Sequence, residues 1–286
     1  MVSVIIPAYN EENTIGDIIR RIRTLHPDYE IIVINDGSID GTAETAEKAG
    51  ATILNHPYNM GNGAAIKSGI RQAKGETLVF MDGDGQHDPN DIARLLKYLP
   101  EYDMVVGFRN LDGHTSFVRA AGNKVYNWFA SYVAKFKIKD LTSGFRIVKA
   151  EIARPLLYLL PNTYSYPTTM TLSILRNGRS LKYVSIGVKS RKSGKSGIGI
   201  FKDGARFFII IVKICTLYSP FRVFLPVSFF LFSMGVIYYL YTFLLWKRFT
   251  NMSALLLTTS IIVFMMGLVS EQICQMHNKD SERFDG

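Results

Sequence analysis

Cysteine is scarce in this chain of 286 residues, which has only two. Cys215 and Cys274 lie in or beside apolar segments, so the sequence indicates neither a disulfide framework nor a thiolate metal site. The histidines are scattered along the chain, which argues against a zinc site. Disulfide-rich and zinc-dependent classes of protein are therefore disfavoured.

Charge is missing from two long stretches, residues 223–246 and 252–270, although charged residues are frequent before Arg222. A helix needs about 20 apolar residues to cross a bilayer, so both stretches are long enough to be membrane spans. Residues 247–251 would form the short connection between them. The alternative is a buried pair of core helices, but helices of globular proteins rarely run so far without a charge.

The chain begins without a basic leader and reaches Pro7 too early for a signal peptide, so we expect its polar part to stay in the cytoplasm. Its net charge of +9 suits an anionic membrane surface or phosphorylated substrates. Nucleic acid would also explain the charge. The two spans, and the lack of a basic helix or a base-stacking motif, argue against nucleic acid.

Strand-like and helix-like segments alternate before residue 110. Apolar runs predict strands near residues 2–6, 31–34, 51–56, 76–80 and 103–108. Helices are predicted after Asn10 or Asn13 and at residues 42–49, 61–75 and 89–99. This alternation predicts an α/β, Rossmann-like fold with a mainly parallel sheet and helices on both faces.

Polar clusters follow three of these strands, at residues 8–11, 35–38 and 82–86. Ligands of such sheets bind beyond the carboxyl ends of strands, so the clusters should meet at one site. The segment LVFMDGDGQHDPNDI, residues 78–92, carries Asp82, Asp84 and Asp88. Like charges this close repel unless a cation or a hydrogen-bonding ligand lies between them. The segment is therefore either a divalent metal site or a solvated acidic turn, which its glycines would also suit.

The glycines of Gly61–Asn62–Gly63 do not form a dinucleotide fingerprint. No strand directly precedes them, and Ile66 occupies the position of the third glycine. They would instead let the backbone approach a ligand at the start of the following helix.

Five motifs, VSVIIPAYNEE, IIVINDGSIDGT, GNGAAIKSG, MDGDGQHDP and DLTSGFR, occur in the order typical of family 2 glycosyltransferases with the GT-A fold. The chain as far as Ala150 resembles that family. With its two spans it looks most like the polyprenyl-phosphate branch, which includes dolichyl-phosphate mannose synthases. The resemblance implies a membrane-bound inverting enzyme that moves a hexose from a UDP- or GDP-sugar to polyprenyl (dolichyl or undecaprenyl) phosphate. It leaves the sugar, the base and a homo-oligomeric state open.

The resemblance also implies where the metal and the donor bind. The metal, Mg²⁺ or Mn²⁺, would be held by Asp82, Asp84 and Gln86, whose oxygens are hard ligands that leave room for a diphosphate. We expect His87 and Asp88 to be turn residues and Pro89 to open the next helix. The nucleotide sugar is implied to contact Pro7, Ala8, Tyr9, Glu11, Asp36, Gly63, Lys67 and Asp82.

Base recognition would rest on Asp36, because Asn35 stands where the family often has a second aspartate. Helix capping is the alternative role for Asp36, and it suits Asp40 better because Asp36 directly follows the strand. The sequence alone does not decide between base recognition and helix capping for Asp36.

Cations gather where phosphates would bind. The resemblance implies that Arg109 and Arg119 act in catalysis together with Asp84. It also implies a mobile basic loop, in which Gly194, Lys195 and Ser196 match a family motif. Acceptor-phosphate contacts are implied for Arg119, Asn123, Arg146, Arg191, Lys195 and Ser196. Arg146 could pair with Asp140 instead, Asn123 replaces a frequent serine, and a run of cations is usually a solvated face.

The segment 199–219 fits an amphipathic helix. Lys202, Arg206 and Lys213 share one face of it and a set of aromatic and aliphatic residues the other, as in helices that lie in a membrane interface. An ordinary core helix is the alternative. We expect a catalytic domain at 1–198, this juxtamembrane helix at 199–219, a transmembrane hairpin at 220–272 and a cytoplasmic tail at 273–286. The protein would be a multi-pass protein of the cell membrane with its catalytic domain in the cytoplasm.

Two other functions fit part of the pattern. A processive polysaccharide synthase with a saccharide acceptor shares the first motifs, but it typically has more membrane helices and a Gln-x-x-Arg-Trp-type motif that this chain lacks. A non-catalytic membrane protein that binds nucleotide sugars would not need Asp82, Asp84 and the basic loop together.

Overall fold

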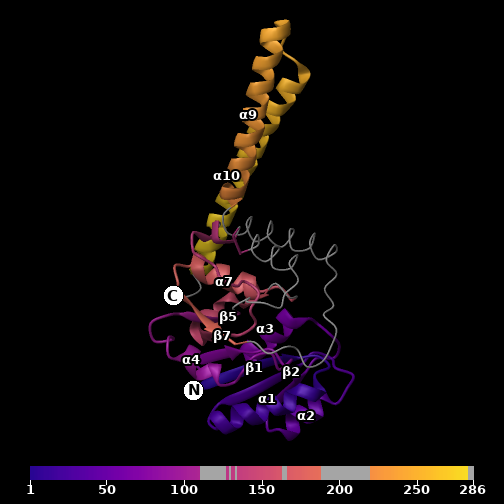
Figure 1. The fold of residues 1–286 in the computed structure, drawn as a ribbon, viewed down its shortest axis with the longest axis vertical. Helices are drawn as coiled ribbons and strands as arrows, with labels where there is room; N and C mark the ends of the chain where they lie inside the picture. The colour runs from indigo at the N-terminus through magenta and orange to yellow at the C-terminus, as the bar shows by residue number, and fades with distance from the viewer. Residues whose placement is uncertain (110–126, 129, 133, 163–165, 188–219, 283–286) are drawn as a thin grey trace. The chain divides into compact units, whose positions relative to one another are not determined.

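A computed structural model describes residues 1–109, 127–128, 130–132, 134–162, 166–187 and 220–282 (Figure 1). The chain divides into two units, Met1–Ile198 and Gly199–Gly286. Each unit is compact.

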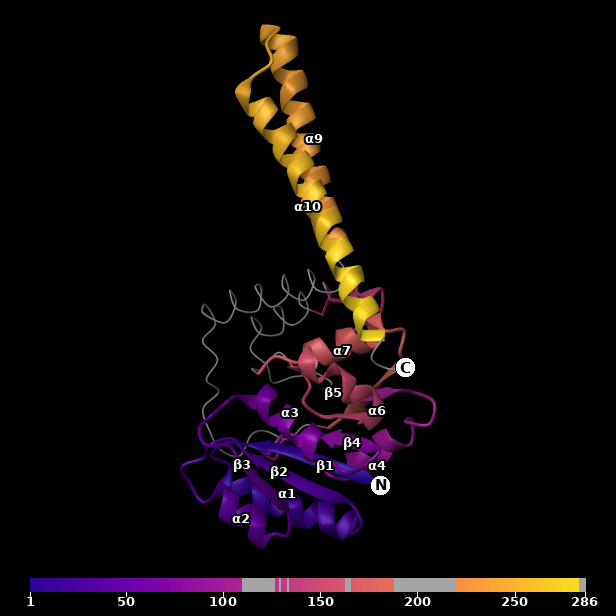
Figure 2. The ribbon, with the colours of Figure 1, turned by 180° about the vertical axis from the view of Figure 1, so that it is seen from behind.

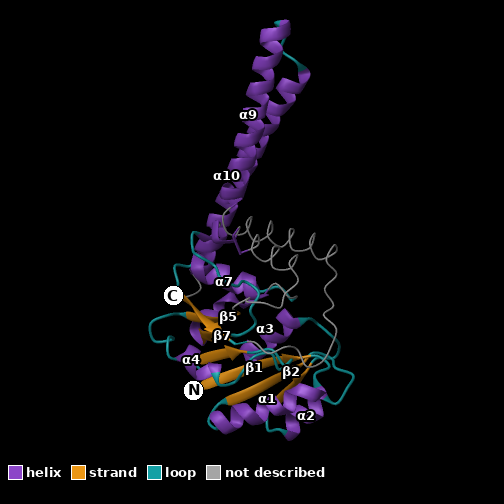
Figure 3. Ribbon diagram, viewed as in Figure 1, coloured by secondary structure: helices purple, strands orange, loops and turns teal. Residues whose placement is uncertain are grey.

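The first unit contains a seven-stranded sheet in the order β3-β2-β1-β4-β6-β5-β7 (Figure 3). Strands β1 to β4 pair in parallel, β5 pairs in parallel with β7, and β6 runs antiparallel to both of its neighbours, β4 and β5. The predicted α/β fold with a mainly parallel sheet is therefore confirmed, and all strands except β6 point the same way. The strands are β1 (Val2–Ala8), β2 (Glu30–Asn35), β3 (Thr52–Asn55), β4 (Thr77–Phe80), β5 (Met104–Arg109), β6 (Arg146–Lys149) and β7 (Leu181–Ile186).

Helices follow the first four strands, as the alternation predicts. After residue 145 the described part of the first unit adds two strands and further helices that were not predicted. Helices with described bounds in this unit are α1 (Glu12–Leu25), α2 (Thr42–Lys48), α3 (Asn62–Gln72), α4 (Asp91–Leu96), α6 (Ala150–Ala153), the 3₁₀ helix η1 (Pro155–Tyr158) and α7 (Tyr166–Arg176). Residues 127–134, apart from 129 and 133, are also described as helical.

Helices cover both faces of the sheet. Successive residues of a strand point to opposite faces, so Val4 and Ile6 of β1 pack with α1 in one core cluster. Ile5 points the other way, and a Cβ on Gly69 of α3 would lie only 2.3 Å from its side chain. Figures 1 and 2 accordingly show α1 and α2 on one side of the sheet and α3 on the other.

The strand order reverses between β1 and β4. Strands β2 and β3 continue to one side of β1, whereas β4 lies on its other side. In sheets of this kind a crevice for ligands opens beyond the carboxyl ends of the strands at the reversal. The turn after β6 does not contribute to that edge. Because β6 is antiparallel, it is the segment before Arg146 that lies there.

The second unit contains a hairpin of two long apolar helices, α9 (Pro220–Trp246) and α10 (Asn251–Glu282). Pro220–Trp246 and Asn251–Met276 are long and apolar enough to cross a membrane. The hairpin exposes large apolar side chains, with Phe229, Leu244 and Met276 each at least 67% exposed. A pair of soluble core helices would bury such residues, so the exposure favours lipid as their surroundings.

Small residues occupy the seam between α9 and α10 at every seventh position. Heptad spacing keeps one face of each helix against its partner, and small residues let the two backbones approach closely. A Cβ on Gly267 would lie 2.7 Å from the Cβ of Phe224, and the hydroxyl of Ser228 donates to the Ser260 carbonyl at 2.9 Å. Glu271 accepts from the Phe221 amide at 3.3 Å, which places an acidic group at the amino end of α9. The buried seam residues are Ser228, Gly235, Thr242, Ser253, Ser260, Gly267 and Cys274.

We predict that Gly267→Leu separates the two helices and lowers the thermal stability of the hairpin in detergent, by about 1–3 kcal/mol, because the added atoms have no space beside Phe224. Met266→Leu is the matched control, since Met266 is 55% exposed on the same turn. Equal melting temperatures for the two variants, measured by circular dichroism at 222 nm, would contradict this packing.

Candidate functional site

Three loops meet at the carboxyl edge of the sheet and are joined by hydrogen bonds. The turn after β1 holds Asn10 in a left-handed conformation, with φ of 56°, and its side chain accepts from the Ile39 amide at 3.0 Å. The hydroxyl of Thr14, on α1, donates to the Gly83 carbonyl at 2.7 Å. The predicted clusters at residues 8–11, 35–38 and 82–86 therefore do come together.

Asp36 is buried and its carboxylate is held by the protein itself. One oxygen accepts from the Met60 amide at 2.9 Å and from Nδ1 of His56 at 2.7 Å, and the other accepts from the Gly61 amide at 2.9 Å. Gly37, with φ of 73°, allows this approach, because a Cβ there would meet the Tyr58 backbone at 2.5 Å. Asp36 therefore shapes the loop at residues 56–61, which adds a structural role to its predicted contact with the nucleotide.

The chain of bonds continues from Asp36 into α3. The side chain of His56 is only 7% exposed and bridges two partners. Its Nδ1 contacts Asp36, and its Nε2 lies 2.9 Å from the hydroxyl of Ser68. The start of α3 is thereby fixed relative to β2, with Gly63 buried in its first turn and Lys67 partly exposed one turn later. Burial lowers the pKa of Lys67, and repulsion from Arg71 lowers it further.

Asn35 and Asp40 have structural roles. The side chain of Asn35 donates to Asn55 Oδ1 at 2.8 Å and accepts from the Ser38 amide at 3.1 Å, so it joins the ends of β2 and β3. Asp40 accepts from the Thr42 amide at 3.1 Å, but the N-cap position of α2 is Gly41 and carries no side-chain cap. Asp40 therefore fixes the turn before α2 without occupying the predicted capping position.

Asp82 lies directly against the backbone of a distant segment. A Cβ built on Gly144 would be 2.3 Å from Oδ2 of Asp82 and 2.7 Å from its Oδ1, so a side chain at position 144 would force this carboxylate to move. Gly144 belongs to the DLTSGFR motif, whose strand β6 pairs with β4, the strand that ends at Phe80. The antiparallel pairing therefore delivers Gly144 to the end of β4 and beside the acidic loop.

The acidic loop itself is tightly turned. Gly85 has φ of 74°, a left-handed conformation that favours glycine, and Oδ1 of Asp84 accepts from the Gln86 amide at 3.1 Å. Asp82, Asp84 and Gln86 remain partly exposed at the carboxyl edge. Two carboxylates and an amide oxygen that face solvent fit a Mg²⁺ or Mn²⁺ ion which shares its shell with a ligand. Within the described ranges no cluster of three His, Cys, Asp or Glu residues offers a closed metal cage.

His87 lies in the turn, as expected, but its side chain is buried, which the sequence did not indicate. Only 5% of it is exposed, its ring stacks on Phe145 with centroids 5.2 Å apart, and its Nε2 lies 3.6 Å from Oδ2 of Asp82. The sequence of the turn does not indicate this burial, because it depends on contact with Phe145, which directly precedes β6. Asp88 is a turn residue as expected, and it accepts from the Asn90 amide at 3.1 Å and from Arg21 at 2.7 Å.

Arg146 cannot contact an acceptor phosphate where it lies, which corrects the role implied for it. Its side chain is fully buried and donates to the Ser143 carbonyl, and also to the Pro167 carbonyl at 2.8 Å. Burial lowers the pKa of Arg146, whereas Tyr166, Tyr183 and two nearby carboxyl groups raise it. The cation therefore braces the segment that carries Gly144 instead of facing a substrate.

The remaining predicted residues fall into two groups. Pro7, Ala8, Tyr9 and Glu11 lie at the end of β1 and in the turn after it, where Tyr9 is 45% exposed and Glu11 is buried. Arg109 ends β5 at the same edge of the sheet, although only its backbone is described. Outside the described residues lie Arg119, Asn123, Arg191, Lys195, Ser196 and the predicted amphipathic helix at 199–219.

Comparison with known proteins adds two family matches. Residues 3–157 match the family described as Glycosyl transferase family 2, and residues 219–276 match the one described as GtrB C-terminal hairpin. The second match covers both apolar helices.

Individual relatives agree with these matches. An undecaprenyl-phosphate mannosyltransferase of Micrococcus luteus is 29% identical over 209 residues, covering 68% of this chain and 86% of the relative. A putative glycosyltransferase, CsbB, of Bacillus subtilis is 26% identical over 99% of this chain and 89% of its own length. Among solved structures, glucosyl-3-phosphoglycerate synthase from Mycobacterium tuberculosis in complex with Mn²⁺, UDP-glucose and phosphoglyceric acid has a TM-score of 0.61 at 21% identity. It covers 75% of this chain and 79% of its own, and this likeness supports the fold.

We predict that Gly144→Ala lowers Mn²⁺ affinity by about 10- to 100-fold, because the new methyl group must displace the Asp82 carboxylate and such overpacking costs about 1–3 kcal/mol. The affinity is measured by electron paramagnetic resonance of free Mn²⁺. Gly187→Ala is the control, since a Cβ there meets nothing within 4 Å. If both variants bind Mn²⁺ as the parent does, the contact between Asp82 and Gly144 does not govern the metal site.

Proposed function

This chain belongs to glycosyl transferase family 2, and we propose that it moves a hexose from a UDP- or GDP-sugar to a polyprenyl phosphate in the membrane, with inversion at the anomeric carbon. One observation carries the proposal. The carboxyl edge of the sheet, at the reversal of strand order between β1 and β4, presents Asp82, Asp84 and Gln86 together beside the loops that follow β1 and β2.

The choice of acceptor rests on the second unit. A soluble saccharide would not require membrane helices, whereas a polyprenyl phosphate is itself held in the bilayer. The hairpin match and the mannosyltransferase relative, whose name specifies undecaprenyl phosphate, support the same acceptor class. Dolichyl and undecaprenyl phosphates remain equivalent by this reasoning, because both present the same headgroup.

In the proposed reaction an oxygen of the lipid phosphate attacks the anomeric carbon on the face opposite to the diphosphate. The bond from that carbon to the diphosphate oxygen breaks, and its electron pair leaves with the nucleoside diphosphate. A phosphate monoester has its second pKa near 6, so the acceptor is already mostly ionised at pH 7 and needs no dedicated base. A divalent cation held by Asp82, Asp84 and Gln86 would neutralise charge on the diphosphate.

The described residues contribute positioning. Asp36, through His56 and the amides of Met60 and Gly61, would fix the loop that borders the nucleotide. Gly144 and His87 would fix Asp82 where the diphosphate binds. Preorganised groups of this kind stabilise a transition state without moving during the reaction. Arg109 and Arg119 would add positive charge near the leaving group, and the basic loop around Lys195 would hold the acceptor phosphate.

We place the catalytic domain at residues 1–198 and the tail after the hairpin on the cytoplasmic side of the cell membrane. Two spans return the chain to the side on which it began, and cations precede Arg222. The segment 199–219 would lie in the interface between the domain and the spans.

The direct test is turnover of the purified chain with a panel of UDP- and GDP-sugars and a polyprenyl phosphate, with the glycolipid product detected by mass spectrometry. We predict that Asp84→Asn reduces transfer at least 100-fold with the fold intact, because it removes ligand charge at a turn that is already polar. Asp17→Asn, on the exposed face of α1, is the control and should retain full activity. Metal-dependent turnover of Asp84→Asn at the parent rate would exclude the assigned site.

The acceptor site has its own test. We predict that replacing Arg191 and Lys195 together by alanine lowers the rate of transfer to lipid about tenfold or more but changes nucleotide-sugar affinity less than twofold, because phosphate recognition uses these cations. The control replaces Arg20 and Lys48, two exposed cations of the first unit. An unchanged transfer rate, or a soluble saccharide that outperforms the lipid, would refute the proposed acceptor.

A further inference from the structure

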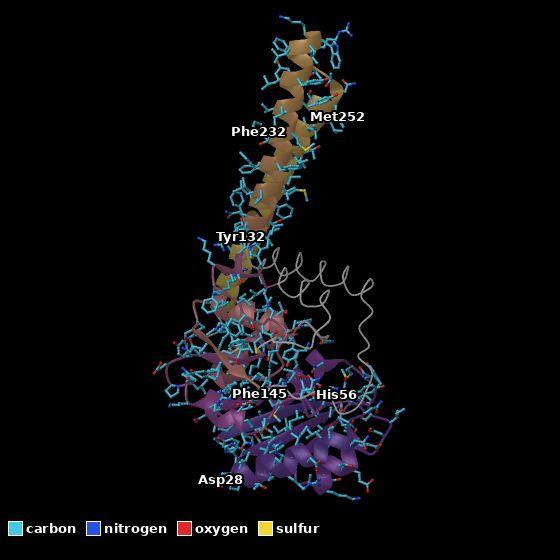
Figure 4. All side chains as sticks on the ribbon, in the orientation of Figure 1. Asp28, His56, Tyr132, Phe145, Phe232 and Met252 are labelled. Carbon is cyan, nitrogen blue, oxygen red and sulfur yellow. The ribbon has the colours of Figure 1, made fainter. Side chains whose placement is uncertain are left out.

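A surface outside the candidate site combines exposed aromatic rings with lysines. It is formed by Trp128, Tyr132, Lys135, Lys137 and Lys139, which we call the lysine–aromatic patch. In the first unit Tyr132 lies at the end opposite to Asp28 (Figure 4). None of the residues assigned to nucleotide, metal or acceptor belongs to this patch.

The aromatic half of the patch is a pair of rings on one helical face. Residues 127–134, except for 129 and 133, are described as helical, so positions 128 and 132 lie one above the other. Trp128 is 67% exposed and Tyr132 is 48% exposed, and their rings stack with centroids 6.5 Å apart. Ala130, on another face of the same helix, is buried. The helix therefore turns its small residue inward and its large rings outward.

The lysine half follows directly. The helix ends at Lys135, whose φ of 51° is left-handed, and the next residues alternate between exposed and covered positions. Lys135, Lys137 and Lys139 are exposed, whereas Ile138 is buried and Phe136 is partly covered. Alternation of this kind puts Lys135 and Lys137 on the outer side of the segment, whereas the ammonium of Lys139 lies over the ring of Phe108, 4.5 Å from its centroid.

Hydrogen bonds fix the two halves to each other. The amide side chain of Asn127 donates to the Lys139 carbonyl at 2.9 Å and accepts from the Leu141 amide at 3.3 Å. The hydroxyl of Ser131 accepts from the Ile138 amide at 3.0 Å. The rings and the lysines are therefore carried by one hydrogen-bonded structure.

Within the described residues of the range 127–141, every exposed charged side chain is a lysine. The one acidic residue among them, Asp140, is buried and accepts from the Thr142 amide at 2.9 Å. Tryptophan and tyrosine are enriched where a protein meets the boundary between lipid and water, and lysines beside them complement anionic headgroups. The same chain carries two helices fit to cross a bilayer, so a membrane surface is within reach of this unit.

We propose that the lysine–aromatic patch binds the anionic surface of the bilayer and gives the catalytic unit a membrane contact separate from the hairpin. Such a contact restricts how the catalytic unit is oriented at the bilayer surface, so it fixes how the carboxyl edge of the sheet faces the lipid headgroups. The inference depends on neither the sugar nor the nucleotide.

The chain offers a direct probe, because it has two tryptophans and Trp246→Phe leaves Trp128 as the only one. The full-length Trp246→Phe variant is reconstituted in phosphatidylcholine vesicles, with or without phosphatidylglycerol. Its fluorescence is then quenched either by lipids brominated near the headgroup or by aqueous iodide. We expect anionic vesicles to give blue-shifted emission, at least twofold stronger quenching by the brominated lipid and at least twofold weaker quenching by iodide.

Charge-removing variants complete the test. Lys135→Gln, Lys137→Gln and Lys139→Gln, combined in the Trp246→Phe background, should remove the dependence on phosphatidylglycerol. The control exchanges three exposed lysines elsewhere in the unit, Lys48, Lys74 and Lys97, and should keep it. The proposal is overturned if iodide quenches Trp128 fully in anionic vesicles, or if Trp128 is shielded equally in every lipid composition, as a protein partner or second copy would shield it. Glycosyl transfer is assayed separately, so failure of the proposed function would be distinguishable.

Discussion

The contact between the carboxylate of Asp82 and the backbone of Gly144 determines the candidate site. It joins two segments that are far apart in sequence, and it is possible only because β6 runs antiparallel between β4 and β5. A side chain at position 144 would occupy the space of the carboxylate. The acidic loop is therefore shaped by the DLTSGFR motif as much as by its own glycines.

Packing behind this contact keeps the carboxylate in place. Phe145 stacks on His87, and Arg146 donates to the Ser143 carbonyl in the same segment and to the Pro167 carbonyl in α7. A fully buried guanidinium is costly unless its N–H groups are paired, so these carbonyls favour one conformation of the segment. Burial raises the pKa of the Tyr166 hydroxyl, and the nearby charge of Asp82 raises it further, so Tyr166 stays neutral beside the cation. The buried guanidinium of Arg146 thus links α7 and the segment before β6, close to the acidic loop.

The sequence predicted much of this arrangement, and the failures have physical reasons. The alternation of apolar strands and polar turns was enough to place the ends of β1, β2 and β4 at one edge. Strand β6 has only four residues, which is too short for a clear periodic pattern, and β7 follows a helix that was not predicted. Neither strand was therefore predicted. The burial of His87 and the role of Arg146 were not predicted, because both depend on residues that come from other elements. The seam of the hairpin was not predicted either, because it follows from small residues at every seventh position and not from hydrophobicity.

The central claim is that Asp82, Asp84 and Gln86 hold a divalent metal together with the diphosphate of the donor. It is tested most directly by anomalous diffraction from crystals of the protein grown with Mn²⁺ and UDP or GDP. The account predicts a manganese peak at coordination distance, roughly 2 Å, from a carboxylate oxygen of the acidic loop and from an oxygen of the diphosphate. A bound nucleoside diphosphate with manganese elsewhere, or with no manganese beside Asp82 and Asp84, would contradict it.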